Sequence, residues 1–134
     1  MALVAHSSGT DGARRAGDHD HRVIGVISPN AHGYFFGTLL SGVLDVAAAR
    51  DVGVVTVQAN DAGIHTFSDE PFSVPLGWDH FDALVVTMDA VSGAYLRAFA
   101  ESGRPVVTVY KAPEDFTCPT VVPDNEQGVR VAVD

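Results

Sequence analysis

The sequence predicts an α/β domain with an open, mostly parallel five-stranded sheet and helices on both faces. Short runs of β-branched and apolar residues alternate with longer stretches in which apolar residues recur every three or four positions. The strand runs are apolar almost throughout, which is typical of parallel strands that are covered on both faces. In addition, the run Val23–Ile27 passes through a loop of small residues straight into a helical pattern. Such a junction predicts a ligand-facing edge at the carboxyl end of the sheet.

Composition limits the classes of protein to which the chain can belong. Its 134 residues, 46% of them hydrophobic, suffice for one compact domain. Acidic residues outnumber basic ones by 17 to 8, and no Lys/Arg cluster offsets this locally, so we expect no direct contact with nucleic acid or membrane. A single cysteine, Cys118, and the absence of a signal-peptide pattern favour the cytoplasm.

Residues 1–21 are interpreted as a flexible polar leader, because they are rich in Gly, Ser, Asp, His and Arg and show no periodicity. The run His19-Asp20-His21 could bind a metal ion. Imidazoles without a fixed geometry make a poor site, however, so we interpret this run as part of a mobile tail and expect no metal.

The domain itself is assigned to residues 22–134 and begins with a β-α-β pattern. Val23–Ile27 is predicted to be a buried strand, and Tyr34–Arg50 a helix with apolar residues at spacings of three and four. Gly53 is a candidate left-handed cap after that helix. Val54–Gln58, which is rich in valine, is predicted to be the second strand.

The next segment, Asn60–His80, contains prolines and glycines and predicts an irregular connection with at most one short helical turn. Trp78 and Phe81 are expected to pin the end of this connection against the sheet. Asp82–Met88 then predicts a third strand, and Val91–Glu101 a helix with an apolar stripe.

The last elements follow a break at Ser102–Pro105. Val106–Tyr110 predicts a fourth strand and Thr120–Val122 a short fifth one. A final helical pattern covers Asn125–Asp134. Together with the first three strands, these elements complete the predicted sheet.

The loops after the strands are the expected ligand-binding region. Parallel strands all end at one edge, and helix N-termini at that edge favour ligand oxygen atoms through their free N–H groups and dipole. Tyr34 and Phe35 could stack on an apolar or sugar face. The residues that could supply directional hydrogen bonds are Asn30, His32, Lys111, Asp124 and Asn125.

Several of these residues have simpler structural interpretations. Asp124 can equally be the N-cap of the last helix, where its carboxylate accepts backbone N–H groups. His32 can be a solvated turn residue, and Lys111 a surface charge after a strand. Gly37 and Gly42 within one helix cost about 1 kcal/mol each relative to Ala, which indicates close approach by another backbone, such as that of a second subunit.

Several motifs follow one another along the chain, namely Val23–Asn30, Gly33–Phe36, Leu39–Val43, Phe81–Val86, Gly103–Val107 and Pro123–Gly128. Their order and spacing resemble the N-terminal lobe of the effector-binding core of lactose/purine-repressor (LacI) type regulators, which have the type I periplasmic-binding-protein fold. The resemblance covers residues 22–134. It implies a small-molecule effector in a cleft lined by Asn30, His32, Tyr34, Phe35, Lys111, Asp124 and Asn125.

The chain also departs from that family pattern. Family members carry a helix-turn-helix before this core and a second α/β lobe after it, whereas here a polar leader precedes the core and the sequence stops within the helix after Asp124-Asn125. We therefore expect a lobe truncated before its partner lobe. Trp78-Asp-His80 with Pro123-Asp-Asn125 is similar to a subset of sensor lobes that precede GGDEF-type signalling domains.

Two functions follow as expectations. The first is a sugar- or nucleoside-sensing module of a bacterial-type regulatory protein, which controls transcription or a signalling output domain. The second is a dimerisation or interaction module that binds no ligand of its own. No phosphate-binding loop or nucleophile elbow occurs, so we expect neither an enzyme nor a cofactor, and we expect a homodimer.

Overall fold

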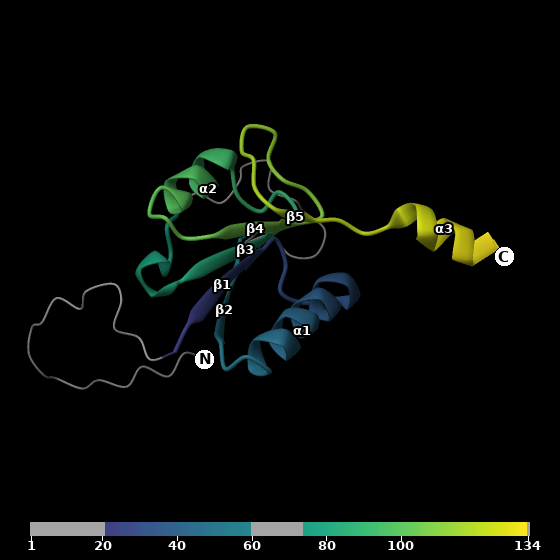
Figure 1. Ribbon diagram of the computed structural model, residues 1–134, viewed down its shortest axis with the longest axis horizontal. Coiled ribbons are helices and arrows are strands. Elements are labelled where there is room, and N and C mark those ends of the chain that lie inside the picture. Colours follow the sequence, from purple (N-terminus) through teal and green to yellow (C-terminus); the bar gives the residue numbers. More distant parts are fainter. Residues whose placement is uncertain (1–20, 60–73, 134) are drawn as a thin grey trace, which may run out of the picture.

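A computed structural model describes residues 21–59 and 74–133 of the chain (Figure 1). Residues 1–20 of the predicted leader, most of the predicted irregular connection, and Asp134 lie outside these ranges. The strands are β1 (Val23–Ser28), β2 (Gly53–Gln58), β3 (Ala83–Thr87), β4 (Val106–Val109) and β5 (Thr120–Val121). The helices are α1 (Tyr34–Ala48), the 3₁₀ turn η1 (Trp78–His80), α2 (Gly93–Ala100) and α3 (Asn125–Val133).

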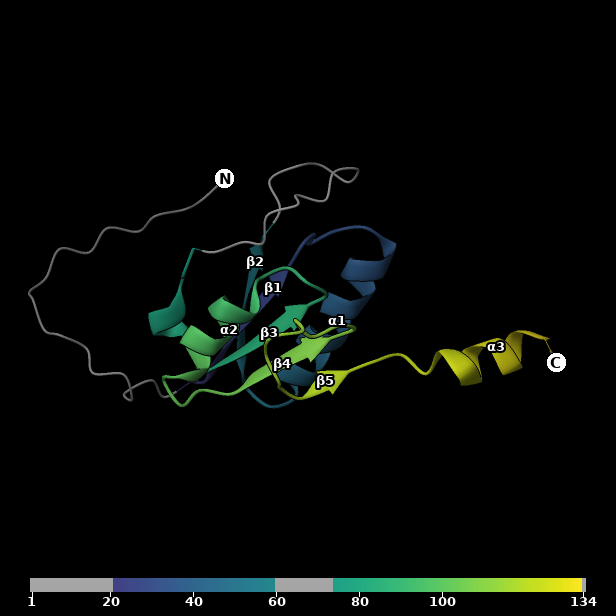
Figure 2. The ribbon, with the colours of Figure 1, turned by 90° about the horizontal axis from the view of Figure 1, so that it is seen from above.

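The five strands form one sheet in the order β2-β1-β3-β4-β5, and every neighbouring pair is parallel. Figure 2 shows this order from above, and Figure 1 shows α1 and α2 on opposite faces of the sheet. These observations confirm the predicted α/β class, its parallel strands and its helices on both faces. They also confirm each predicted strand and helix within the described ranges, with boundaries shifted by at most two residues.

The main hydrophobic core lies between the sheet and α2. Alternate residues of β3 and β4 turn to this face and are buried, and the helix adds Leu96 and Phe99, which are fully covered. The apolar stripe predicted for this helix is therefore the side of α2 that packs against the sheet. The buried members of this core are Ile27, Phe81, Leu84, Val86, Ala90, Val91, Tyr95, Leu96, Phe99 and Val106.

Two aromatic residues fasten the end of the 74–80 segment to the core. The ring of Phe81 lies against β1 at Gly25, where an added Cβ would be only 2.4 Å from the Cδ2 atom of the ring. Trp78 packs edge-on against Tyr95 and Phe99, at centroid distances of 4.9 and 5.5 Å, and its Nε1 donates to the Tyr95 hydroxyl. This confirms the prediction that Phe81 pins the connection against the sheet, whereas Trp78 attaches it to α2 on the same core.

Arg104 completes this attachment from the start of β4. Its guanidinium lies 4.1 Å from the ring centroid of Phe99 and donates to the backbone carbonyls of Trp78 and Phe81. A guanidinium that stacks on an aromatic ring and satisfies two carbonyls gains from both interactions. The connections before β3 and before β4 are thus held together at the amino end of the sheet.

The turn after α1 differs from its prediction. Asp51, at φ 54°, takes the left-handed conformation, whereas Gly53 is the first residue of β2 and donates its N–H to the Arg22 carbonyl at 2.8 Å. The proposed cap at Gly53 is therefore wrong. The helix closes earlier, because the N–H of Val52 bonds back to the Ala47 carbonyl, and an aspartate tolerates the left-handed region better than most residues.

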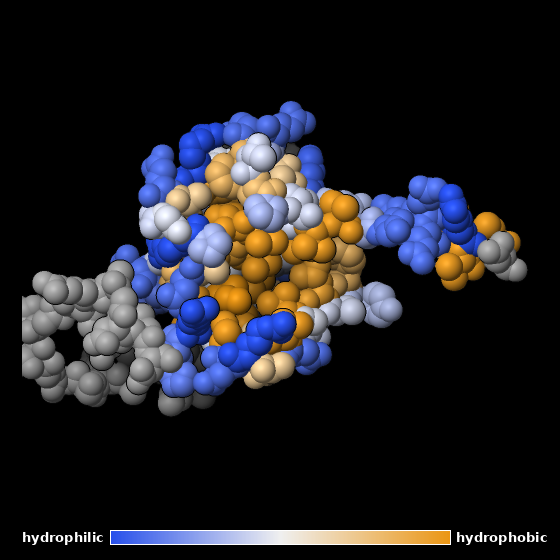
Figure 3. Space-filling model, in the orientation of Figure 1, coloured by the Kyte–Doolittle hydropathy of each residue, from blue (hydrophilic) through white to orange (hydrophobic). Residues whose placement is uncertain are grey.

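The opposite face of the sheet is only partly covered. Of the residues in α1, only Ala47 is buried, and Val85, Val107 and Val109 on this face of β3 and β4 remain half-buried. Figure 3 shows apolar residues gathered at the centre of the view. Within the described part of the chain, nothing lies within 4 Å of a Cβ placed at any glycine of α1, so no close backbone approach occurs there.

The glycines of the sheet and of α1 should respond oppositely to alanine. We expect Gly25→Ala to lower the free energy of unfolding by about 1–3 kcal/mol, because the new methyl group collides with the buried Phe81 ring. Gly42→Ala on the open side of α1 should raise it by about 0.5–1 kcal/mol. Urea unfolding followed by the fluorescence of Trp78 measures both, and equal effects would contradict the packing described.

Burial raises the pKa of the Tyr95 hydroxyl above its ordinary value of 10.0, and the hydrogen bond from Trp78 opposes this in part. The folded chain therefore holds this proton more tightly than the unfolded chain does. The resulting stabilisation is complete below pH 10 and is lost as the pH rises through the folded-state pKa. In urea titrations between neutral and strongly alkaline pH, Tyr95→Phe should show a smaller alkaline loss of stability than the parent chain.

Candidate functional site

The carboxyl edge of the sheet contains a topological switch point between β1 and β3. The chain leaves β1 toward β2 on one side, and the connections from β3 onward run toward β4 and β5 on the other. Open α/β sheets bind their ligands at such points, because the two outgoing loops diverge and leave room between them. The loop after β1 therefore belongs to the candidate ligand-binding site.

Buried hydroxyl groups fix this loop at the switch point. Thr87, at the end of β3, donates to the Ser28 hydroxyl at 2.9 Å, and Ser28 donates to the Asn30 carbonyl at 2.6 Å. The Asn30 side-chain oxygen accepts the His32 N–H at 3.2 Å. The side chain of Asn30 thus shapes its own turn, and that of His32 is exposed.

Helix α1 begins at this loop without a side-chain cap. Gly33, at φ 85°, takes a conformation that favours glycine, and its carbonyl accepts the first helical hydrogen bond, from Gly37 at 2.9 Å. No acidic residue lies in the first turn. The N–H groups of that turn are consequently available to oxygen atoms outside the helix.

Three aromatic side chains lie at this edge, and we call Tyr34, Phe35 and Tyr110 the aromatic rim. Phe35, which is 50% exposed, meets the ring of Tyr110 edge-on at a centroid distance of 6.4 Å. Tyr34 is 94% exposed and extends into solvent. The Phe35–Tyr110 contact links the first turn of α1 directly to the end of β4, across β3.

Strands β3 and β4 end in the same unusual way. Met88 (φ 56°) and Tyr110 (φ 79°) follow them directly, and both are left-handed although neither is glycine. Each is held by a backbone hydrogen bond to the neighbouring strand, from Met88 to Val109 at 2.8 Å and from Tyr110 to Val121 at 2.7 Å. Conformations of this kind cluster at functional sites, where surrounding contacts outweigh a cost of about 1–3 kcal/mol.

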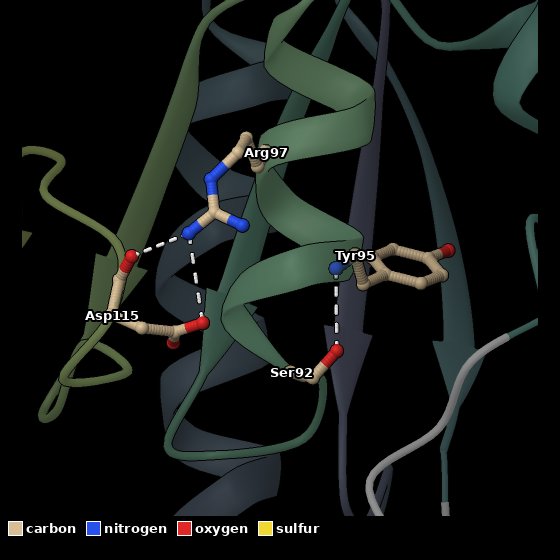
Figure 4. A network of polar contacts seen from close by, with 4 residues as sticks. All are labelled: Ser92, Tyr95, Arg97 and Asp115. Atoms are coloured by element: carbon tan, nitrogen blue, oxygen red, sulfur yellow. Dashed lines mark hydrogen bonds and ion pairs between the residues drawn. The ribbon is translucent and has the colours of Figure 1, made fainter.

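The loop between β4 and β5 is fastened to α2 (Figure 4). Arg97 donates to the Asp115 carbonyl at 2.6 Å and lies 3.6 Å from its carboxylate. The same carboxylate lies so close to Gly93 that a Cβ there would be 1.9 Å from Oδ1. Ser92 is the N-cap of α2, and its hydroxyl oxygen accepts the Tyr95 N–H at 3.2 Å. This loop also carries Lys111, whose side chain is exposed.

The residues after β5 stand apart from the aromatic rim. Asp124 accepts the Gln127 N–H on its carboxylate at 3.0 Å, as a helix N-cap does, and Asn125 begins α3. Both are exposed, and α3 extends away from the sheet in both views (Figures 1 and 2). In the described ranges, no hydrogen bond, ion pair or ring contact joins these two residues to Asn30, His32, Tyr34, Phe35 or Lys111.

Tyr110 is the rim residue that sequence reasoning missed. It was assigned to the end of the fourth strand, where its side chain would belong to the sheet. The structure instead ends β4 at Val109 and turns Tyr110 toward α1. A tyrosine placed between an apolar strand and a lysine was the available signal for an exposed, amphipathic contact.

The described residues contain no cluster of three or more His, Cys, Asp or Glu side chains that could hold a metal ion. His21, the described member of the predicted histidine run, lies 3.4 Å from Asp51 at the opposite edge of the sheet. Cys118 lies 3.6 Å from the Thr108 hydroxyl and is partly buried. None of the helices in residues 21–59 and 74–133 is long and apolar enough to span a membrane.

Comparisons with protein-family models, curated proteins and solved structures found no match. Functional conclusions therefore depend on the chemistry of the carboxyl edge.

The N-cap role of Asp124 can be tested directly. Asp124→Ala should destabilise α3 by about 1 kcal/mol, because the Gln127 N–H loses its acceptor. All residues of α3 are exposed, so the effect should be local, with faster amide exchange at Gln127 and Gly128. Asp124→Asn, which keeps an acceptor oxygen, is the control. Unchanged exchange in Asp124→Ala would show that the carboxylate does not hold the helix.

Proposed function

We propose that the chain is the small-molecule sensing module of a bacterial-type regulatory protein in the cytoplasm, and that its effector is sugar- or nucleoside-like. The observation that carries the proposal is the Phe35–Tyr110 pair, which lies at the switch-point edge beside the uncapped start of α1. Aromatic faces suit a planar base or the apolar face of a sugar, and free N–H groups suit hydroxyl oxygens.

Within this proposal, the residues of the edge take different roles. Tyr34, Phe35 and Tyr110 stack on the effector, and His32 and Lys111 supply polar contacts from the two loops that flank β3. Asn30 orders the first loop through its hydrogen bond to His32. Asp124 and Asn125 lie after β5, where α3 begins and extends away from the sheet. In this proposal they contact the effector from the β5 side of the edge, apart from the aromatic rim.

The resemblance to LacI-type effector-binding cores supports the same proposal and suggests the output. Effector binding between two lobes would change their closure and so bias an attached DNA-binding or signalling domain. A site on one lobe covers only one side of its ligand and buries much less of it than a closed cleft does. The 134-residue chain alone should therefore bind its effector weakly.

A second candidate function is self-association without an effector. It is favoured by the large apolar residues that α1 exposes outside its contact with the sheet, Leu44 and Val46. Because these two residues are two positions apart, they lie on different sides of α1, and each favours contact with a protein partner on its own side of the helix.

Titration of the chain with adenosine, cytidine, ribose and glucose, followed by amide chemical shifts, tests the sensing proposal. We expect shifts confined to the loop after β1 and to Tyr110 with at least one of these compounds. Tyr110→Ala should weaken that binding about tenfold, which is the worth of one stacking contact. Val46→Ala, on the exposed side of α1, should leave it unchanged. Shifts scattered over the whole domain, or none with any compound, would contradict the proposal.

A further inference from the structure

Residues 110–119, which we call the β4–β5 loop, are tied together at their two ends. Tyr110 donates its N–H to the Val121 carbonyl at 2.7 Å, and Thr108 donates to the Pro119 carbonyl at 3.0 Å. The loop therefore leaves the sheet and returns to it at neighbouring positions of β4 and β5. Compact loops with close ends are frequently functional, and contacts in their middle decide which path they take.

Two neighbouring residues hold the middle of this loop. Phe116 packs against the hydrophobic core and is partly buried. Asp115 is held from α2, because Arg97 donates to its carbonyl at 2.6 Å and lies 3.6 Å from its carboxylate (Figure 4). The middle of the β4–β5 loop is thus attached to α2, whereas its first residue, Tyr110, contacts Phe35 of α1.

The first turn of α2 leaves room for the Asp115 carboxylate. Gly93 is buried there, and the three atoms nearest to a Cβ placed on it, at 1.9 to 2.7 Å, all belong to this carboxylate. A side chain at position 93 would push the carboxylate out of its place. Glycine is a poorer helix former than alanine, so the close approach of Asp115 gives a physical reason for glycine here.

Tyr110 has a backbone conformation that its surroundings must maintain. Its φ of 79° is left-handed, which is unfavourable for a bulky side chain. Lys111–Glu114 join it to Asp115, and Pro113 stiffens this short span by fixing one φ. The position of Asp115 is therefore transmitted to Tyr110. Once Asp115 is released, Tyr110 can relax to a negative φ, and its ring then leaves Phe35.

We propose that Arg97 is a positioning residue of the candidate site. By holding Asp115 at the start of α2, it keeps the β4–β5 loop in the path that places the Tyr110 ring against Phe35. Lys111, the next residue of the loop, is placed in the same way. The inference rests on the proposed sensing function, within which Tyr110 and Lys111 contact the effector.

The exposure of the Arg97–Asp115 pair suits positioning better than a role in stability. The two side chains are 50% and 62% exposed, so water and salt weaken their ion pair, and pairs of this kind add little to stability. The hydrogen bond from the guanidinium to the backbone carbonyl still fixes where the loop lies. Loss of Arg97 should therefore free the loop while the domain stays folded.

The same contacts connect the two faces of the sheet. Helices α1 and α2 lie on opposite faces (Figure 1), and the path from Arg97 through Asp115 and Tyr110 to Phe35 passes around the carboxyl edge between them. An effector that favours the Phe35–Tyr110 contact therefore also favours the Arg97–Asp115 contact. The two effects are equal in size, because coupling between two sites is reciprocal.

Nuclear magnetic resonance of the complete chain without effector tests the positioning. In the parent chain, the rings of Phe35 and Tyr110 should show nuclear Overhauser contacts, and the amide–α coupling constant of Tyr110 should report a left-handed φ. In Arg97→Met, which keeps an apolar stem but no donor, we expect loss of the ring contacts and a coupling constant typical of an extended residue. Urea unfolding should change little.

Three further variants separate positioning from stability. Arg97→Lys keeps a donor for the Asp115 carbonyl and should retain both signals. Arg50→Met is the matched control, because Arg50 donates to the Val46 carbonyl of its own helix and should leave both signals unchanged. Gly93→Ala displaces the Asp115 carboxylate and should weaken the ring contacts, although alanine is the better helix former.

Ring contacts that persist in folded Arg97→Met would overturn the proposal, because the pair would then only fasten the loop without setting Tyr110. Their absence from the parent chain, or equal loss in Arg50→Met, would overturn it too. For a compound that binds the parent chain, Arg97→Met should raise the dissociation constant about fivefold, and an unchanged constant would also count against the role of Arg97. If no compound binds, the sensing proposal fails, and the effector-free ring contacts still decide the role of Arg97.

Discussion

The fit of the Phe81 ring against Gly25 is the contact on which the rest of the fold depends. It joins the residue that leads into β3 to the middle of β1, and so it sets how these two central strands lie together. The same ring borders the core beneath α2, and its backbone carbonyl receives Arg104 from the start of β4. A single missing side chain in β1 thereby lets an aromatic residue align the strands whose far ends form the candidate site.

Much of this architecture could be predicted from sequence, because its elements follow local rules. Apolar runs without alternation predicted parallel strands, and the apolar stripe of Tyr95, Leu96 and Phe99 predicted the helix face that packs. The features that were wrong or missed depend on neighbours distant in sequence. Whether Asp51 or Gly53 became left-handed was decided by the pairing of Gly53 with β1. Tyr110 turned toward α1 because Val121 fixes its backbone, and no local pattern contains that information.

The candidate site divides into two parts with different physical characters. Phe35, Tyr110 and the loop after β1 are held by buried hydroxyl groups, a ring contact and left-handed strand ends, so their positions are fixed by contacts within the domain. Such pre-organisation reduces the entropy lost on binding. Asp124 and Asn125 instead belong to the connection into α3, which extends from the sheet edge with its residues exposed. The sequence could place both parts at one edge, but it could not show that only the first part is fixed by contacts with the rest of the domain.

The helix caps have a consequence for the polarity of this edge. The start of α2 is occupied by Ser92 and by the Asp115 carboxylate, which Arg97 holds in place, and the start of α3 is occupied by Asp124. Both ends thus carry a built-in oxygen acceptor, and any incoming anion would have to displace it. Among the described α-helices, only α1 begins without such an occupant. The edge is therefore asymmetric. Under the proposed sensing function, an electronegative group of the effector would be steered toward the start of α1 at Tyr34 and away from the β4–β5 side, so the effector would have one preferred orientation.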